Sequence, residues 1–133
     1  MIRQTVDLPA DPQSLFAMYL NANVHAAITG FPVTIAAEAG AEFSAFGGQL
    51  SGTILVCAEP RLIVQLWRST KFRDEDLDST LILAFSHGQG GNSGVIDLVH
   101  LDVPDHDYDD VVDGWNKYYW RPWLDYLKRS DER

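Results

Sequence analysis

Residues 109–129 read DDVVDGWNKYYWRPWLDYLKR, and this stretch decides the fold. At 100° per residue, a helix over this range separates polar residues from a mostly aromatic side. The polar side holds Asp113, Lys117, Arg121, Asp125 and Lys128. The opposite side holds Val112, Trp115, Tyr119, Pro122 and Tyr126. A helix of roughly 30 Å with such an aromatic side needs a large apolar surface to pack on.

The only candidate for that surface is a series of predicted strands between residues 33 and 103. Glycines, prolines and charged turns separate these segments, which are rich in β-branched and aromatic residues. The predicted strands are 33–39, 42–46, 49–58, 62–69, 79–86 and 94–103. Short connections between consecutive strands indicate an antiparallel meander.

The N-terminal part adds one strand and two short helices. Residues 2–8 alternate apolar and polar side chains, which predicts a strand with one buried side. Asp11 followed by Pro12 is a helix start, and a second helix from Asn23 to Thr29 ends at Gly30. The sequence therefore predicts a single α+β domain over residues 1–133. Its curved antiparallel sheet wraps around the long C-terminal helix, and the two short helices follow the first strand.

Composition excludes several function classes. The 133 residues carry 19 acidic and 10 basic side chains, a net charge of −9, which disfavours nucleic acid and anionic membranes as partners. Cys57 is the single cysteine, so no internal disulfide forms and a reducing compartment is favoured. The N-terminus has no apolar leader-like segment, and no stretch is long enough for membrane insertion. We therefore expect a cytoplasmic protein.

Six segments, in this order and spacing, resemble a known family. They are 40–43, 46–52, 63–68, 79–85, 98–104 and 114–120. The chain is similar to the bacterial relatives of the activator of heat-shock protein 90 ATPase, within the START-like (SRPBCC) superfamily of helix-grip proteins. The resemblance implies the helix-grip fold and an interior cavity between sheet and long helix. It matches only the C-terminal domain of the eukaryotic activators, which have a further N-terminal domain.

The candidate cavity residues are mostly aromatic and come from the strands and the long helix. They are Phe43, Gln65, Trp67, Phe85, Leu98, His100, Trp115 and Tyr119. By period-two alternation, Gln65 shares a side of its strand with Trp67, and His100 shares one with Leu98. If those sides face inward, both polar groups are able to orient a ligand in an apolar pocket. The alternative is that both are hydrogen-bonded within the protein, and that the rings are ordinary core.

No catalytic, metal or cofactor motif is found. The four histidines, His25, His87, His100 and His106, fall in different elements with no ligand spacing. The acidic run 105–110 departs from a calcium-loop pattern and is typical of a helix start, where the dipole favours negative charge. The glycine-rich loop 88–94 lacks the P-loop ending. We therefore predict no catalytic residues, no metal and no cofactor.

Three functions fit this sequence. The first is a non-enzymatic domain that binds a small apolar or aromatic molecule, such as a lipid, in the cavity. The second is a co-chaperone-like interaction module whose partner is a chaperone. The third is a cyclase or hydrolase that uses His100 with a nearby carboxylate. A cavity of several hundred cubic ångströms favours the first, an exposed apolar patch the second, and a His100–carboxylate or Gln65–carboxylate hydrogen bond the third.

A second apolar side of the long helix lies beside the aromatic one. It consists of Trp120, Trp123, Leu124 and Leu127, at spacing i, i+3, i+4, i+7. These residues pack either against the first two helices or, where exposed, against a second copy of the chain in a homodimer.

Overall fold

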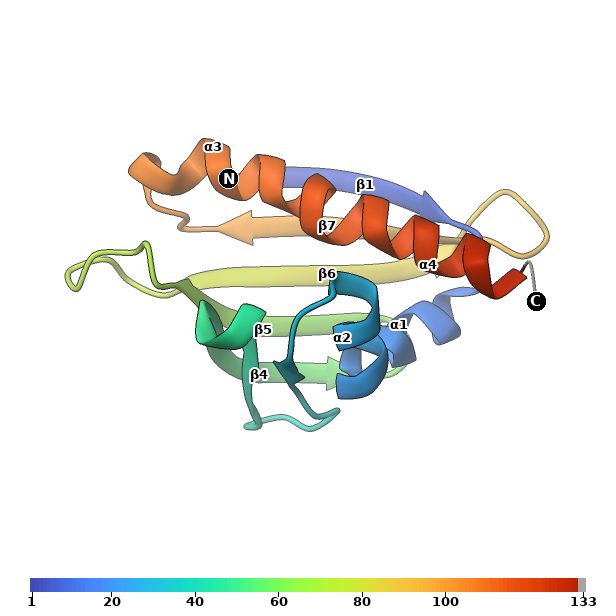
Figure 1. The fold of residues 1–133 in the computed structure, drawn as a ribbon, viewed down its shortest axis with the longest axis horizontal. Coiled ribbons are helices and arrows are strands. Elements are labelled where there is room, and N and C mark those ends of the chain that lie inside the picture. The colour runs from blue at the N-terminus through green and yellow to red at the C-terminus, as the bar shows by residue number, and fades with distance from the viewer. Residues whose placement is uncertain (132–133) are drawn as a thin grey trace.

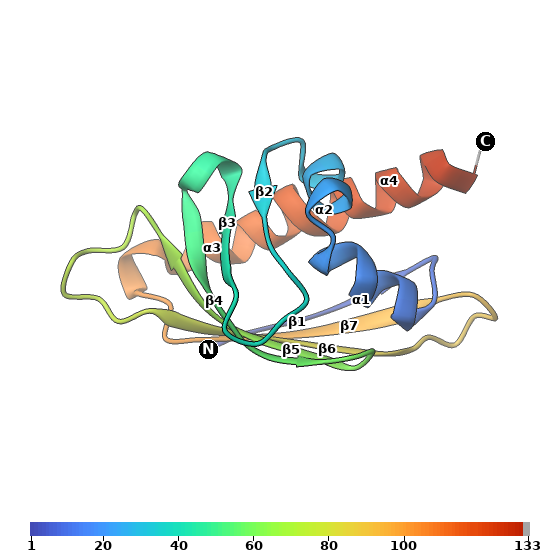
Figure 2. The same ribbon diagram turned by 90° about the horizontal axis from the view of Figure 1, so that it is seen from below.

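The computed structural model describes residues 1–131 as one antiparallel sheet crossed by a long C-terminal helix (Figures 1 and 2). The seven strands are arranged in the order β1-β7-β6-β5-β4-β3-β2. Their bounds are Ile2–Leu8, Val33–Thr34, Glu42–Ala45, Leu50–Ala58, Leu62–Ser69, Ser79–His87 and Gly94–Leu101, for β1 to β7. Helices α1 (Pro12–Leu20) and α2 (Ala22–Thr29) follow the first strand. The predicted α+β helix-grip fold is confirmed.

The inner face of the sheet follows from strict alternation along the central strands. Buried and half-buried residues alternate along β5, and Ile63, Gln65 and Trp67 are all buried. The register places Gln65 opposite Leu81, and Leu81 opposite His100. Both polar residues therefore lie on the face that the long helix covers, as the alternation predicted.

The two short helices begin where their capping residues predict. The Asp11 carboxylate accepts a hydrogen bond from the Ser14 backbone N–H at 2.8 Å, and Pro12 is at the first helical turn. The Asn21 side chain caps α2, so that helix begins slightly earlier than predicted. Gly30 ends it with a φ of +83°, a left-handed conformation that favours glycine.

The predicted strand over residues 33–39 was largely wrong, because β2 contains only Val33 and Thr34. The following residues 36–38 are two alanines and a glutamate, which have low strand propensity. They form a turn instead, in which the Glu38 N–H donates to the Ala36 carbonyl. The sheet therefore ends in a very short edge strand.

The long helix is not a uniform α-helix. It consists of α3 (Tyr108–Gly114), a π-helical segment (Trp115–Trp120) and α4 (Arg121–Asp131). A π-helical turn holds more residues than an α-helical turn. Pro122 gives a physical reason for the wider turn, since a proline ring clashes with the carbonyl four residues before it, here that of Tyr118.

The π-helical segment changes which residues face the sheet. The buried residues follow a four-residue spacing: Val111, Trp115, Tyr119, Trp123 and Leu127, with Trp120 beside them. The prediction that Val112, Pro122 and Tyr126 share the buried side with Trp115 and Tyr119 was correct only in part, because all three are half-buried, although Val112 and Tyr126 pack against the core. That prediction assumed a uniform α-helix, with 100° per residue along its whole length.

The second apolar side of the helix is covered within the chain. Trp120, Trp123 and Leu127 are buried and Leu124 is half-buried, while α2 packs against α4. Of the two alternatives, packing within the chain therefore applies to Trp120, Trp123 and Leu127, and these three are not exposed for a homodimer contact. Within residues 1–131, no helix has both the length and the apolar character needed to cross a membrane.

Candidate functional site

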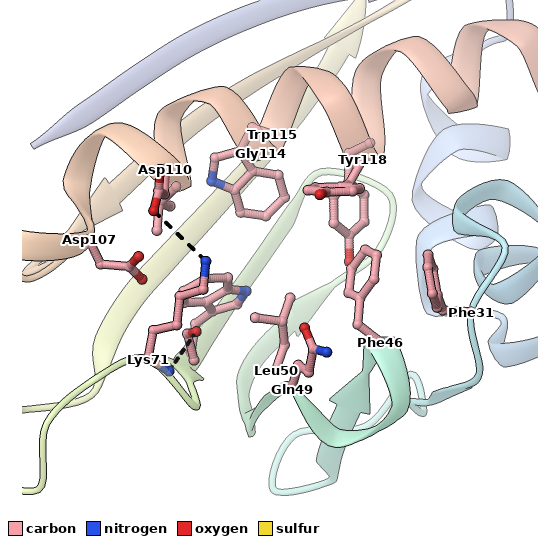
Figure 3. Close-up of a pocket in the computed structure, with 14 residues that line it drawn as sticks. Phe31, Phe46, Gln49, Leu50, Lys71, Asp107, Asp110, Gly114, Trp115 and Tyr118 are labelled. Carbon is pink, nitrogen blue, oxygen red and sulfur yellow. Dashed lines mark hydrogen bonds and ion pairs between the residues drawn. The ribbon is translucent and has the colours of Figure 1, made fainter.

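A cavity of about 330 Å³ opens between the first half of the long helix and the sheet (Figure 3). We call it the helix–sheet pocket. It lies under α3 and the π-helical segment. Figure 2 shows α1 between α4 and the sheet, and α2 packs against the long helix. Its lining residues are Phe31, Phe46, Gln49, Leu50, Trp67, Ser69, Lys71, Asp107, Asp110, Val111, Gly114, Trp115, Tyr118 and Tyr119.

One end of the pocket is aromatic. The Phe46 ring lies 5.6 Å from the Tyr118 ring and 5.9 Å from the Tyr119 ring, between centroids. Phe46 begins a tight turn in which it and the two following glycines all have positive φ, with Phe46 at +54°. A bulky residue adopts that conformation only under constraint, and such strain is concentrated at functional sites. This turn places the Phe46 ring in the pocket lining, next to Tyr118 (Figure 3).

The other end of the pocket is charged, and Figure 3 shows Asp107 and Asp110 near the Lys71 ammonium group, both on the same side of it in this view. The Lys71 Nζ lies 3.8 Å from Asp110 Oδ2, in an exposed ion pair. Asp107 is only 3% exposed. Burial raises the pKa of its carboxyl group and the Asp110 charge adds to this, while Lys71 and His106 act in the opposite direction.

All eight predicted cavity residues are buried between the sheet and the helices. Three of them, Trp67, Trp115 and Tyr119, line the pocket. The remaining five, Phe43, Gln65, Phe85, Leu98 and His100, do not belong to its lining. A ligand-binding role for the eight residues therefore stays a prediction.

Two of the five have a clear packing role. The Phe43 ring covers Gly52 on the neighbouring strand, where an added Cβ would lie 2.7 Å from Phe43 Cε1. The Phe85 ring packs edge-on against Phe16 of α1, with centroids 5.5 Å apart.

His100 lies behind the pocket wall in a complete hydrogen-bond chain. The Ser79 hydroxyl donates its proton to the Trp67 carbonyl at 2.6 Å, so Ser79 Oγ accepts from His100 Nε2 at 2.8 Å. His100 Nδ1 then accepts from Trp115 Nε1 at 3.2 Å. Burial lowers the pKa of His100 to about 3, so the ring is neutral. Its partners are Ser79 and Trp115, not a carboxylate, and the chain fixes the Trp115 ring in the wall.

A second buried polar cluster fixes Tyr119. His25 Nδ1 donates to the Tyr19 carbonyl at 2.8 Å, so His25 Nε2 accepts from the Tyr119 hydroxyl at 2.9 Å. Burial lowers the pKa of His25 to about 4. The Tyr19 hydroxyl donates to Gln65 Oε1 at 2.7 Å. Gln65 Nε2 is buried and has no partner among the described residues. Gln65 contacts no carboxylate here.

Sequence reasoning missed most of the pocket lining. Phe46 was predicted to end the strand 42–46, whereas it begins the turn after that strand, and a large aromatic residue before two glycines is a usable signal for such a turn. Asp107 was assigned to an acidic helix start, and nothing in the sequence separates this buried carboxylate from its exposed neighbours. Among residues 1–131, no three His, Cys, Asp or Glu side chains are grouped to hold a metal ion.

Comparisons with known proteins agree with this architecture. A family model described as Activator of Hsp90 ATPase homolog 1-like protein matches residues 9–123. An Hsp90 activator from Plasmodium falciparum is similar in structure, with a TM-score of 0.85, 20% identity and coverage of 96% of this chain and 95% of that one. A search of curated proteins found no match.

Two further solved structures share the fold. CalU16 from Micromonospora echinospora has a TM-score of 0.73 at 20% identity, over 96% of this chain and 73% of that one. The Aha1 dimer from Colwellia psychrerythraea has a TM-score of 0.72 at 9% identity, over 88% of each chain.

Proposed function

The chain belongs to the Activator of Hsp90 ATPase homolog 1-like family, and on that premise we propose that it binds a small apolar or aromatic molecule in the helix–sheet pocket, without catalysis. The observation that carries the proposal is the pocket itself. Its volume of about 330 Å³ lies in the range of small-molecule sites, and its walls combine aromatic rings with a few polar groups.

The pocket wall is also held in place before any ligand arrives. The His100 chain orients Trp115, and His25 orients Tyr119. Rings that are already ordered lose little conformational freedom on binding, which favours affinity.

The test fills the pocket without disturbing its wall. Gly114 lines the pocket and has helical angles, and a Cβ there would lie no closer than 3.6 Å to Tyr118. We expect Gly114→Leu to fold normally and to lose binding of N-phenyl-1-naphthylamine, a neutral apolar dye, measured by fluorescence titration. Native mass spectrometry of the purified wild-type chain, before and after solvent extraction, identifies any molecule it retains.

The matched control is Gly91→Leu in the β6–β7 loop, where an added Cβ meets nothing within 4 Å. It should bind the dye as the wild type does. Equal binding by the Gly114→Leu and Gly91→Leu variants, or no binding by the wild type, would contradict the proposal.

A co-chaperone-like role is the second candidate. Its support is the likeness to the Plasmodium Hsp90 activator over 96% of this chain, together with the exposed rings of Phe31 and Tyr118 at the pocket rim. The measurement is the ATPase rate of an Hsp90-type chaperone with the wild-type chain and with Phe31→Ser. A rate that the wild type does not change would remove this candidate.

Three further assignments are proposals of smaller scope. The Colwellia relative is a dimer, which supports a homodimer here through a surface other than the buried tryptophans. The lone, half-buried Cys57 supports a reducing, cytoplasmic environment. Cyclase or hydrolase chemistry has no support from His100, because that imidazole contacts Ser79 and Trp115.

A further inference from the structure

We propose that the pocket selects a small aromatic amine, with its ring among the aromatic side chains and its ammonium group against the carboxylate of Asp107. This inference names the ligand class of the proposed function and rests on that function. It starts from the charged end of the pocket, which a purely apolar ligand would leave unused.

Asp107 is a buried carboxylate that turns toward the pocket. The residue as a whole is 3% exposed, its carboxylate oxygens keep accessible surface, and no donor among residues 1–131 hydrogen-bonds to them. Burying a charge is unfavourable unless a partner of opposite charge or a hydrogen-bond donor is present. Figure 3 shows the carboxylate on the pocket side of its short helical turn, with Lys71 beside it. A ligand ammonium group would donate hydrogen bonds to these accessible oxygens.

Lys71 is a weak partner for Asp107. Its Nζ pairs with Asp110 at 3.8 Å, and the two side chains are 66% and 71% exposed, so water screens that pair. The pocket end then has two carboxylates against one ammonium group. The net charge of the whole chain is −9, which also attracts cations. Charge at this end therefore favours a cationic ligand over an anionic one.

The aromatic walls fit the other half of such a ligand. Trp67 and Trp115 have ring centroids 6.2 Å apart, and Trp115 and Tyr119 have centroids 4.9 Å apart. These rings offer both stacking and cation–π contact. A volume of about 330 Å³ has room for one or two fused rings with a short side chain.

The experiment compares three ligands that share one ring system: tryptamine, indole-3-propionate and 3-methylindole. Isothermal titration calorimetry on the full chain should show tryptamine binding about tenfold more tightly than the carboxylate, as charge-assisted hydrogen bonds require. Asp107→Asn should remove that preference and leave the affinity for 3-methylindole unchanged. Lys71→Gln should strengthen tryptamine binding, because it removes a competing cation.

The control is Asp113→Asn, an exposed carboxylate on the side of the same helix that faces away from the pocket. It should bind all three compounds as the wild type does. Lys71 is exposed, so its variant tests the sign of the effect even if Asp107→Asn melts early. Weaker tryptamine binding after Lys71→Gln would overturn the inference.

The ligand series separates the two proposals. If 3-methylindole binds and tryptamine has no advantage over the carboxylate, the amine inference fails and ligand binding stands. If none of the three compounds binds the wild type, both the amine inference and the ligand-binding proposal fail.

Discussion

The two halves of the long helix face the same sheet but enclose different interiors. Below α4, the short helices fill the space, and Trp123 and Leu127 are buried. The pocket lies below α3 and the π-helical segment, and no residue of α1 or α2 belongs to its lining. The position of the covering helices, more than the curvature of the sheet, therefore determines where a cavity remains in this fold.

Each half also contains one buried, neutral histidine. His25 lies on α2 and orients Tyr119, while His100 lies on β7 and orients Trp115. Both rings belong to the π-helical segment and line the pocket, so a histidine from each half helps to fix the wall of the open half. Substitutions that act on one half more than on the other test the difference in packing between the halves, and pH changes test the two buried histidines.

The largest effect is expected from Trp123→Ala in the covered half. Trp123 is 1% exposed and stacks on Trp120, so its removal leaves a closed cavity. We expect a loss of about 3–5 kcal/mol in the free energy of unfolding, measured by urea denaturation. The counterpart in the open half is Tyr118→Ala, whose ring is 43% exposed, with an expected loss of about 1 kcal/mol. Similar losses for the two variants would show that the halves are equally packed.

Mild acid should destabilise both halves. Burial lowers the pKa of His25 to about 4 and that of His100 to about 3, below the ordinary 6.5. As the pH falls below 6.5, the unfolded chain therefore binds protons that the folded chain excludes, and stability decreases until those folded-state pKa values are reached. At pH 5 we expect a loss of about 2 kcal/mol from each histidine.

The measurement is the urea midpoint at pH 7 and at pH 5, for the wild type and for His25→Gln and His100→Gln. Each variant should remove about half of the wild-type difference between the two pH values. A histidine whose variant keeps the full difference would not be buried and neutral as described.

The sheet was predictable from sequence because alternation leaves little freedom once one face is buried. The inward orientation of Gln65 and His100 followed from counting by two, and the register confirms it. The short helices were predictable from Asp11 and Gly30, whose side-chain and backbone chemistry act locally.

The buried side of the long helix was predicted only in part, because its period changes at the π-helical segment. Pro122 signals a disturbed helix, but the sequence does not say whether the helix kinks, ends or widens there. The pocket depends on contacts between distant segments, such as Phe46 with Tyr118 and Lys71 with Asp110. Periodicity along one segment carries no information about such contacts.

The last comparison takes one glycine from each half, and the smallest effect is expected at Gly114. Gly114 in the open half has helical angles and room for a Cβ, so Gly114→Ala should stabilise the chain by about 0.5–1 kcal/mol. Gly94 lies below α1, where an added Cβ would come within 2.7 Å of the Ala10 carbonyl oxygen. Gly94→Ala should therefore destabilise by about 1–3 kcal/mol. The measurement is the melting temperature of the two variants. A lower melting temperature for Gly114→Ala than for the wild type would mean that the pocket end is as tightly filled as the covered end.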